Sequence, residues 1–156
     1  MKKIPLIKPY LDIKEQNAVN YCLKSGWLSF RGNYVKKFED KFKKFIGGGH
    51  VLTTSNGTHS IELALLALGI KKGDEIIIPD FSFVATINAV LNIEAKPVIV
   101  DVNLKNWLID IEKIKKNISK KTKAILFVNT YGIVENIRKI KKIVKKNKLL
   151  LLEDCA

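Results

Sequence analysis

The feature that most constrains this chain is an unbroken run of leucines, residues 149–152, followed directly by Glu153 and Asp154. An apolar run of this length after a lysine-rich segment is typical of a strand buried on both faces, as in a parallel sheet. Open α/β sheets bind their ligands at the carboxyl ends of such strands. A carboxylate there is costly to desolvate unless it meets a cation or strong donors. The run therefore predicts a parallel sheet that carries part of a binding site at its edge.

The rest of the chain alternates helical and strand patterns. A capping-box pair, Asp12 and Glu15, predicts a helix that ends at Gly26, and apolar residues from Val35 to Phe45 predict a second helix. We expect strands at residues 51–54, 75–79, 97–102, 124–128 and 149–152. We expect the later helices at residues 58–68, 83–91, 110–117 and 137–144. Alternating strands and helices predict an α/β fold with a mainly parallel sheet and right-handed crossovers.

Composition limits the possible partners. The 156 residues suffice for one α/β domain with a real core, and the formal net charge is +13. Most of this charge comes from lysines on the polar faces of predicted helices, and arginine is nearly absent from these runs. We therefore favour a solvated surface, with no nucleic-acid partner, over a basic α/β nucleic-acid-binding module, which stays as an alternative. The positive field would still attract nucleotides and phosphates.

Few residues suggest metal or redox chemistry. The two cysteines, Cys22 and Cys155, are far apart and predict neither a disulfide framework nor a zinc site, and no metal site is expected. Of the two histidines, His50 is expected at the surface and His59, which has no evident partner, is expected to be a bystander. No signal peptide or membrane span is evident, so we expect a cytoplasmic protein without a membrane partner.

A strand-to-helix turn offers a seat for phosphate. Ser55, Asn56, Gly57 and Thr58 join the predicted strand at 51–54 to the next helix. Glycine allows close backbone approach, and the helix start supplies free N–H groups at the positive end of the dipole. An equally good interpretation is a simple N-cap by Asn56 or Thr58. The GxGxxG and GxxxxGK[ST] fingerprints are both absent, which disfavours dinucleotide and P-loop sites.

Two further strand ends add other chemistry. Phe81 and Phe83 follow the strand at 75–79, where they could pack in the core or form a flat wall for a planar ligand. Asn129 and Thr130 follow the strand at 124–128. Together with the phosphate seat and Asp154, these ends suit a planar, cationic, phosphorylated ligand. Pyridoxal phosphate fits, because its pyridinium nitrogen needs a carboxylate.

An ordered set of motifs covers nearly the whole chain. They are Trp27, Leu28, Ser29 and Gly32; Phe38 and Glu39; Ser55, Asn56, Gly57 and Thr58; residues 73–79; residues 97–102; and Glu153, Asp154, Cys155 and Ala156. This set resembles the N-terminal part of the DegT/DnrJ/StrS family of pyridoxal-phosphate-dependent nucleotide-sugar aminotransferases. The segments around Ile4 and Trp27 resemble its perosamine-synthase branch. The resemblance implies the large domain of the fold-type-I (aspartate aminotransferase) transferases.

The resemblance also implies roles for single residues. Gly57 and Thr58 would hold the cofactor phosphate, Phe83 would stack on the pyridine ring, and Asp154 would pair with the ring nitrogen. Asn129 stands where many members have histidine, and no role is carried over to it. Cys155 stands where alanine is common, which fits a small buried residue.

The resemblance further implies what this chain does not contain. Family members carry a Schiff-base lysine well beyond the Glu-Asp motif, so the catalytic lysine is expected beyond Ala156 and no catalytic residue within the chain. We expect a partial large domain at 1–156, with N-terminal arm helices at 12–46, an α/β part at 50–156, and no C-terminal small domain. A fragment, a split gene product and a degenerate relative are all compatible with this pattern.

The function implied is transfer of an amino group, with glutamate as the expected donor, to a keto-deoxy nucleotide sugar. Such a reaction belongs to deoxysugar and polysaccharide biosynthesis, and the full-length enzyme is expected to be a homodimer. The chain alone is expected to be inactive. The alternative is a non-catalytic relative that binds sugar nucleotides or acts in regulation.

Overall fold

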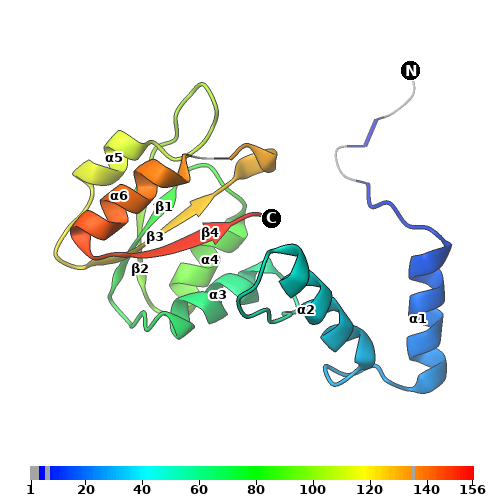
Figure 1. Cartoon of the computed structure of the whole chain (residues 1–156). Coiled ribbons are helices and arrows are strands. Elements are labelled where there is room, and N and C mark those ends of the chain that lie inside the picture. Colours follow the sequence, from blue (N-terminus) through cyan, green and yellow to red (C-terminus); the bar gives the residue numbers. More distant parts are fainter. Residues whose placement is uncertain (1–3, 6–7, 135) are drawn as a thin grey trace. The chain divides into compact units, whose positions relative to one another are not determined.

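The computed structural model describes residues 4–5, 8–134 and 136–156. By its internal contacts the chain forms two compact units, Met1–Thr53 and Thr54–Ala156. The first unit is helical and the second contains the sheet (Figure 1).

The N-terminal unit contains the helices α1 (Ile13–Ser25) and α2 (Asn33–Phe45). The predicted capping box is confirmed, because Asp12 accepts from the Lys14 N–H and the Glu15 carboxylate accepts from the Asp12 N–H at 2.8 Å. The hydrogen bond from the Lys14 N–H, and then that with Glu15, lowers the pKa of Asp12. Gly26 ends α1 in the left-handed conformation at φ 72°, which glycine adopts without strain.

The apolar residues of the two N-terminal helices are not buried. No residue of α1 or α2, all of which the structure describes, is buried. Phe38 and Phe42 stack at 5.7 Å between ring centroids on α2. Within this unit, Trp27, Leu28 and Ser29 line a pocket of about 210 Å³ together with Gly32 and neighbouring residues. A Cβ on Gly32 would lie 3.1 Å from the Ser29 carbonyl oxygen, so this tight turn requires glycine.

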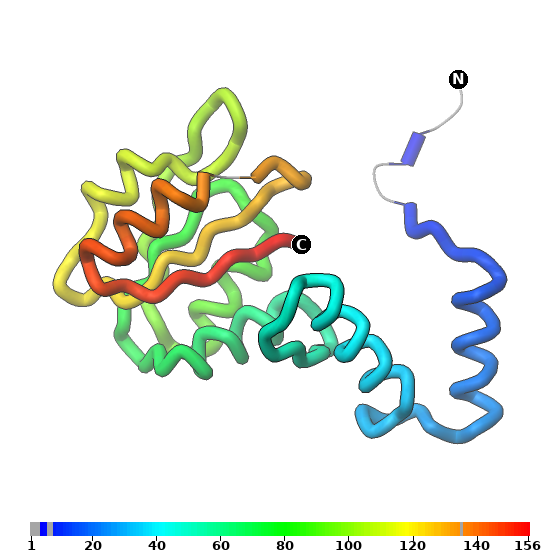
Figure 2. The backbone as a smooth tube through the Cα atoms, in the orientation of Figure 1, coloured from blue at the N-terminus to red at the C-terminus, as the bar shows by residue number. Residues whose placement is uncertain are grey.

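The second unit is built on four parallel strands, β1 (Glu75–Pro79), β2 (Lys96–Val100), β3 (Thr122–Val128) and β4 (Leu150–Asp154). Their order in the sheet is β2-β1-β3-β4, and every neighbouring pair is parallel. The tube in Figure 2 shows how the chain leaves the sheet and returns between successive strands. The parallel α/β sheet predicted from the sequence is confirmed.

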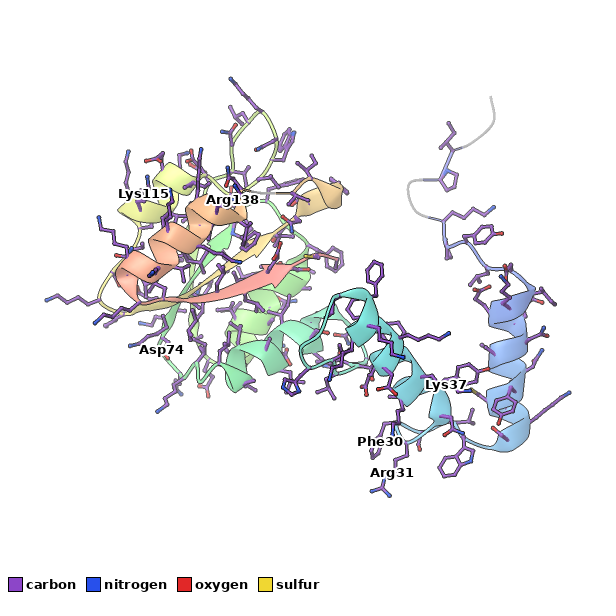
Figure 3. All side chains as sticks on the ribbon, in the orientation of Figure 1. Phe30, Arg31, Lys37, Asp74, Lys115 and Arg138 are labelled. Atoms are coloured by element: carbon purple, nitrogen blue, oxygen red, sulfur yellow. The ribbon has the colours of Figure 1, made fainter. Side chains whose placement is uncertain are left out.

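Helices cover both faces of this sheet. The helices α3 (Gly57–Ala67) and α4 (Val84–Asn92) pack on one face, in a core formed with Ile76, Ile78, Ala124 and Leu126. The helices α5 (Ile111–Lys116) and α6 (Ile137–Asn147) form the other core, with Ile77, Ile125 and Phe127. Figure 3 shows Lys115 on α5 and Arg138 on α6, and the six cationic residues of α6 are all exposed.

Two expectations about the strands need correction. Residues 51–54 are not a strand; the Thr53 N–H donates to the Glu39 carboxylate at 2.9 Å instead of to a neighbouring strand. The leucines of β4 are half-buried rather than fully buried, because β4 lies at the edge of the sheet. Its side chains nevertheless alternate as expected, with Leu150 and Leu152 in one core and Leu149 and Leu151 in the other.

A residue at the end of α6 offers a test of this fold. Lys148 follows the helix in the left-handed conformation, with φ 53°, which costs a non-glycine residue about 1 kcal/mol. We expect Lys148→Gly to raise the free energy of unfolding by about 0.5–1 kcal/mol in urea titrations. Lys145→Gly removes the same side chain inside the helix, and this substitution should lower the free energy of unfolding by about 1 kcal/mol. Destabilisation by both substitutions would contradict the assigned end of α6.

Candidate functional site

The carboxyl ends of all four strands define one edge of the sheet. Because the strands are parallel, their last residues, Pro79, Val100, Val128 and Asp154, lie along this carboxyl edge. The segments that follow β1 and β3 carry the phenylalanines and Asn129, and the acidic pair singled out in the sequence forms the end of β4 itself. Such an edge is where open α/β sheets bind ligands.

The start of α3 lies at the same edge. The far end of this helix leads into Gly69 and Ile70, which line a pocket with Asp74, Lys123 and Leu150 at the beginnings of β1, β3 and β4. Asp74 is labelled at this amino edge in Figure 3. The 11 residues of α3 extend about 16 Å, which is close to the length of a five-residue strand. Figure 1 accordingly shows the start of α3 and the arrowhead of β4 on the same side.

The first turn of α3 presents free donors. Asn56 is its N-cap, and the Asn56 side-chain oxygen accepts from the His59 N–H at 2.9 Å. The N-cap interpretation is therefore confirmed for Asn56. Within the described part of the chain, the N–H groups of Gly57 and Thr58 have no hydrogen-bond partner. The cap and a phosphate seat are thus compatible, because they use different N–H groups.

His59 has a partner that the sequence did not reveal. The Ser55 hydroxyl lies 2.7 Å from His59 Nδ1, and Asn56 Nδ2 lies 3.3 Å from the same nitrogen. The amide orientation of Asn56 is fixed by its cap, so its NH₂ faces the ring nitrogen as a donor. The Ser55 hydroxyl and the Asn56 amide can both donate to His59 Nδ1 when that nitrogen carries no proton. The expectation of a histidine without a partner is wrong.

Gly57 is not required by the backbone. Its φ lies outside the left-handed region, and an added Cβ would meet nothing within 4 Å. A helix start of this kind accepts other residues, so the fold leaves the glycine unexplained. Open space beside a free N–H is what close approach of a ligand to the backbone requires.

The aromatic residues after β1 differ in their environment. Phe83 is the N-cap of α4 and 78% exposed, so its ring is not part of the core. Phe81 instead packs against Trp107, with ring centroids 5.3 Å apart. Of the two alternatives for Phe83, packing in the core is excluded, and a wall beside a ligand stays a prediction.

Carboxylates at this edge are held in different ways. The half-buried Asp154 accepts a hydrogen bond from the Ala156 N–H at 3.0 Å through Oδ1. Asp101, after β2, forms an ion pair with Lys113. The hydrogen bond to Asp101 raises the pKa of Lys113. Asp154 is not neutralised by any cation among the described residues.

Together these groups provide free N–H donors, an exposed aromatic ring and an anionic carboxylate at one edge. The described residues contain no cluster of three potential metal ligands. None of the described helices is long and apolar enough to cross a membrane. The chemistry of the edge is that of a site for an anionic group at one end and a cationic one at the other.

Comparison with known proteins decides the family. The profile of the DegT/DnrJ/EryC1/StrS aminotransferase family matches residues 9–156. The chain belongs to this family. The GDP-perosamine synthase of Escherichia coli O157:H7 is 42% identical over the whole chain, and that of Vibrio cholerae is 40% identical over 98% of it. The chain spans 43% and 42% of the lengths of these two relatives.

Solved structures of related enzymes have the same fold. The E. coli GDP-4-keto-6-deoxy-D-mannose-3-dehydratase with bound hydrated PLP matches with a TM-score of 0.89 at 33% identity, over 100% of this chain and 41% of that protein. NtdA from Bacillus subtilis with bound PMP matches with a TM-score of 0.85 at 38% identity, over 89% and 32%. The expected transferase fold and the expected family are therefore confirmed for this chain.

The structure also points to a residue that sequence reasoning left without a role. Asn129 is buried directly after β3, and its side chain contacts Glu153. A polar residue next to a run of buried apolar ones was the available signal. Its partner could not be predicted, because it depends on the register between β3 and β4.

The glycine at the start of α3 allows a direct test. We expect Gly57→Ala to leave the free energy of unfolding within about 0.5 kcal/mol of wild type, because its φ is ordinary and the space is open. The control Gly73→Ala, where φ is +83°, should cost about 1 kcal/mol or more. Both values come from urea denaturation. A large loss in Gly57→Ala would show that the fold, and not a ligand, requires this glycine.

Proposed function

We propose that this chain forms the cofactor-binding N-terminal part of a pyridoxal-phosphate-dependent aminotransferase that acts on a keto-deoxy nucleotide sugar. The observation that carries the proposal is the placement of Asp154 and the free N–H groups of Gly57 and Thr58 at one edge of the sheet. The substrate class follows from the perosamine synthases and the sugar dehydratase to which the chain is similar.

The residues at the edge fit the proposed cofactor. The N–H groups of Gly57 and Thr58 would bind its phosphate at the positive end of α3. The exposed ring of Phe83 would cover one face of the pyridine ring. Asp154 would hold a proton on the ring nitrogen, because a carboxylate favours the charged form of a neighbouring base. When bound, the cofactor supplies an electron sink for transfer of the amino group.

The remaining parts of the proposal concern the catalytic lysine, the amino donor, the assembly and the location of the enzyme. The lysine that would carry the cofactor, and the small domain, are expected in the part of the relatives that this chain does not span. We further propose glutamate as the amino donor, a homodimer as the assembled enzyme and the cytoplasm as its location. In domain terms, residues 12–46 would form the arm and residues 50–156 part of the large domain.

Cofactor binding tests the proposal directly. At low ionic strength the chain should bind pyridoxal phosphate, and Asp154→Asn should weaken binding at least about tenfold, the loss typical of a charged hydrogen-bonding partner. Equilibrium dialysis with absorbance detection measures this. Glu94→Gln removes an equal charge from an exposed residue that precedes β2 at the amino edge. Equal loss in both variants would show that only the overall charge matters.

The chain by itself should show no aminotransferase turnover. Transfer of the amino group requires a lysine that holds the aldehyde and moves the proton, and that lysine is expected in the remaining portion. The assay follows formation of 2-oxoglutarate from glutamate in the presence of pyridoxal phosphate and a keto-sugar nucleotide. Measurable turnover would contradict the assignment of the lysine.

A further inference from the structure

Asn129 connects the ends of two neighbouring strands. It follows β3 directly and is only 6% exposed, which is unusual for an amide side chain. Its N–H donates to the carbonyl oxygen of Asp154 at 2.9 Å. Its side-chain Nδ2 donates to Glu153 Oε1 at 2.7 Å and lies 3.5 Å from Cys155 Sγ. The residue that follows β3 thus contacts three successive residues, two at the end of β4 and one directly after it.

These bonds determine where the Asp154 carboxylate lies. Successive side chains of a strand point to opposite faces, so holding Glu153 beside Asn129 directs Asp154 to the other face. The main-chain bond to the Asp154 carbonyl fixes the peptide that follows, one step beyond the pairing of Val128 with Asp154. Among the described residues, the Asp154 side chain itself accepts a hydrogen bond only from the Ala156 N–H. The position of the Asp154 side chain is therefore determined mainly by Asn129 and Glu153.

The chemical nature of Asn129 also matters. A neutral amide satisfies one oxygen of Glu153 without adding a charge beside Asp154. An acidic residue at this position would repel Glu153. A cationic one would pair with Glu153 and place a like charge near a cationic ligand.

We propose that Asn129 is a positioning residue, which aims the Asp154 carboxylate at the ring nitrogen of the cofactor through its bonds to Glu153 and to the Asp154 carbonyl. This inference rests on the proposed function, since it assumes that Asp154 meets the cofactor. It assigns Asn129 no contact with the cofactor and no part in the transfer itself.

Binding of pyridoxal phosphate to the 156-residue chain measures the effect. Asn129→Asp, which is nearly isosteric, and Asn129→Ala should each raise the dissociation constant about tenfold, because a partly buried hydrogen bond to a charged group is lost. Glu153→Gln keeps an acceptor oxygen and should stay within about twofold, whereas Glu153→Ala should reproduce the loss. In the Glu153→Ala variant, adding Asn129→Ala should raise the dissociation constant little further, because the two residues act through the same bond.

The control removes a comparable amide elsewhere. Asn147 on α6 is exposed, but its side chain donates a partly buried hydrogen bond to the Ile143 carbonyl at 2.9 Å. Asn147→Ala should lose stability but keep the dissociation constant of the wild type. Unchanged binding in both Asn129 variants, or an equal loss in Asn147→Ala, would overturn the proposal.

A measurement without cofactor separates the two hypotheses. Carboxyl ¹³C resonances of Glu153 and Asp154 should both shift in Asn129→Asp and Asn129→Ala, and neither should shift in Asn147→Ala. If the wild-type chain does not bind pyridoxal phosphate, the proposed function fails, while these shifts still decide whether Asn129 positions Asp154. An Asp154 carboxyl resonance that is unchanged in both Asn129 variants would contradict the positioning role.

Discussion

The parallel alignment of four strands is the constraint on which the rest of this structure depends. Parallel pairing sends every strand end to one edge and requires a crossover before each return. It therefore brings Asp154, at the end of the chain, to the same edge as Gly57, almost a hundred residues earlier. No local interaction could place these two residues together. The candidate site exists because the sheet is parallel.

Of the strand pairs, that of β3 with β4 matters most for the site, because it places Asp154 at this edge. Val128 lies opposite Asp154, and the Asn129 N–H extends the ladder by one further bond. β4 is at the edge of the sheet, with half-buried leucines that contribute to both cores. An edge strand offers unpaired backbone groups to further pairing.

Much of the fold could be predicted because its signals are local. The capping box at Asp12 and the glycine stop at Gly26 define α1, and short apolar runs define β1 and β3. Residues 51–54 have a similar apolar and β-branched composition, but no strand pairs with them among the residues that the structure describes. Their Thr53 N–H bonds to Glu39 instead. A strand depends on its partner, and the sequence of one segment does not contain that information.

The site was predictable only in part for the same reason. Gly57, Thr58, Phe83 and Asp154 each follow a recognisable strand or begin a helix, and family resemblance supplied their roles. The bond between Ser55 and His59 and that between Asn129 and Glu153 depend on side-chain positions and on register. No periodic pattern in the sequence predicts either of these two bonds. The family profile confirms the fold assignment, and the roles of the four residues stay predictions.

The most direct test of the central claim is the ¹⁵N resonance of pyridoxal phosphate labelled at its ring nitrogen and bound to this chain near neutral pH. If Asp154 pairs with that nitrogen, the resonance will lie in the protonated range and will move to the unprotonated range in Asp154→Asn. A wild-type resonance in the unprotonated range, or one unaffected by Asp154→Asn, would contradict the account.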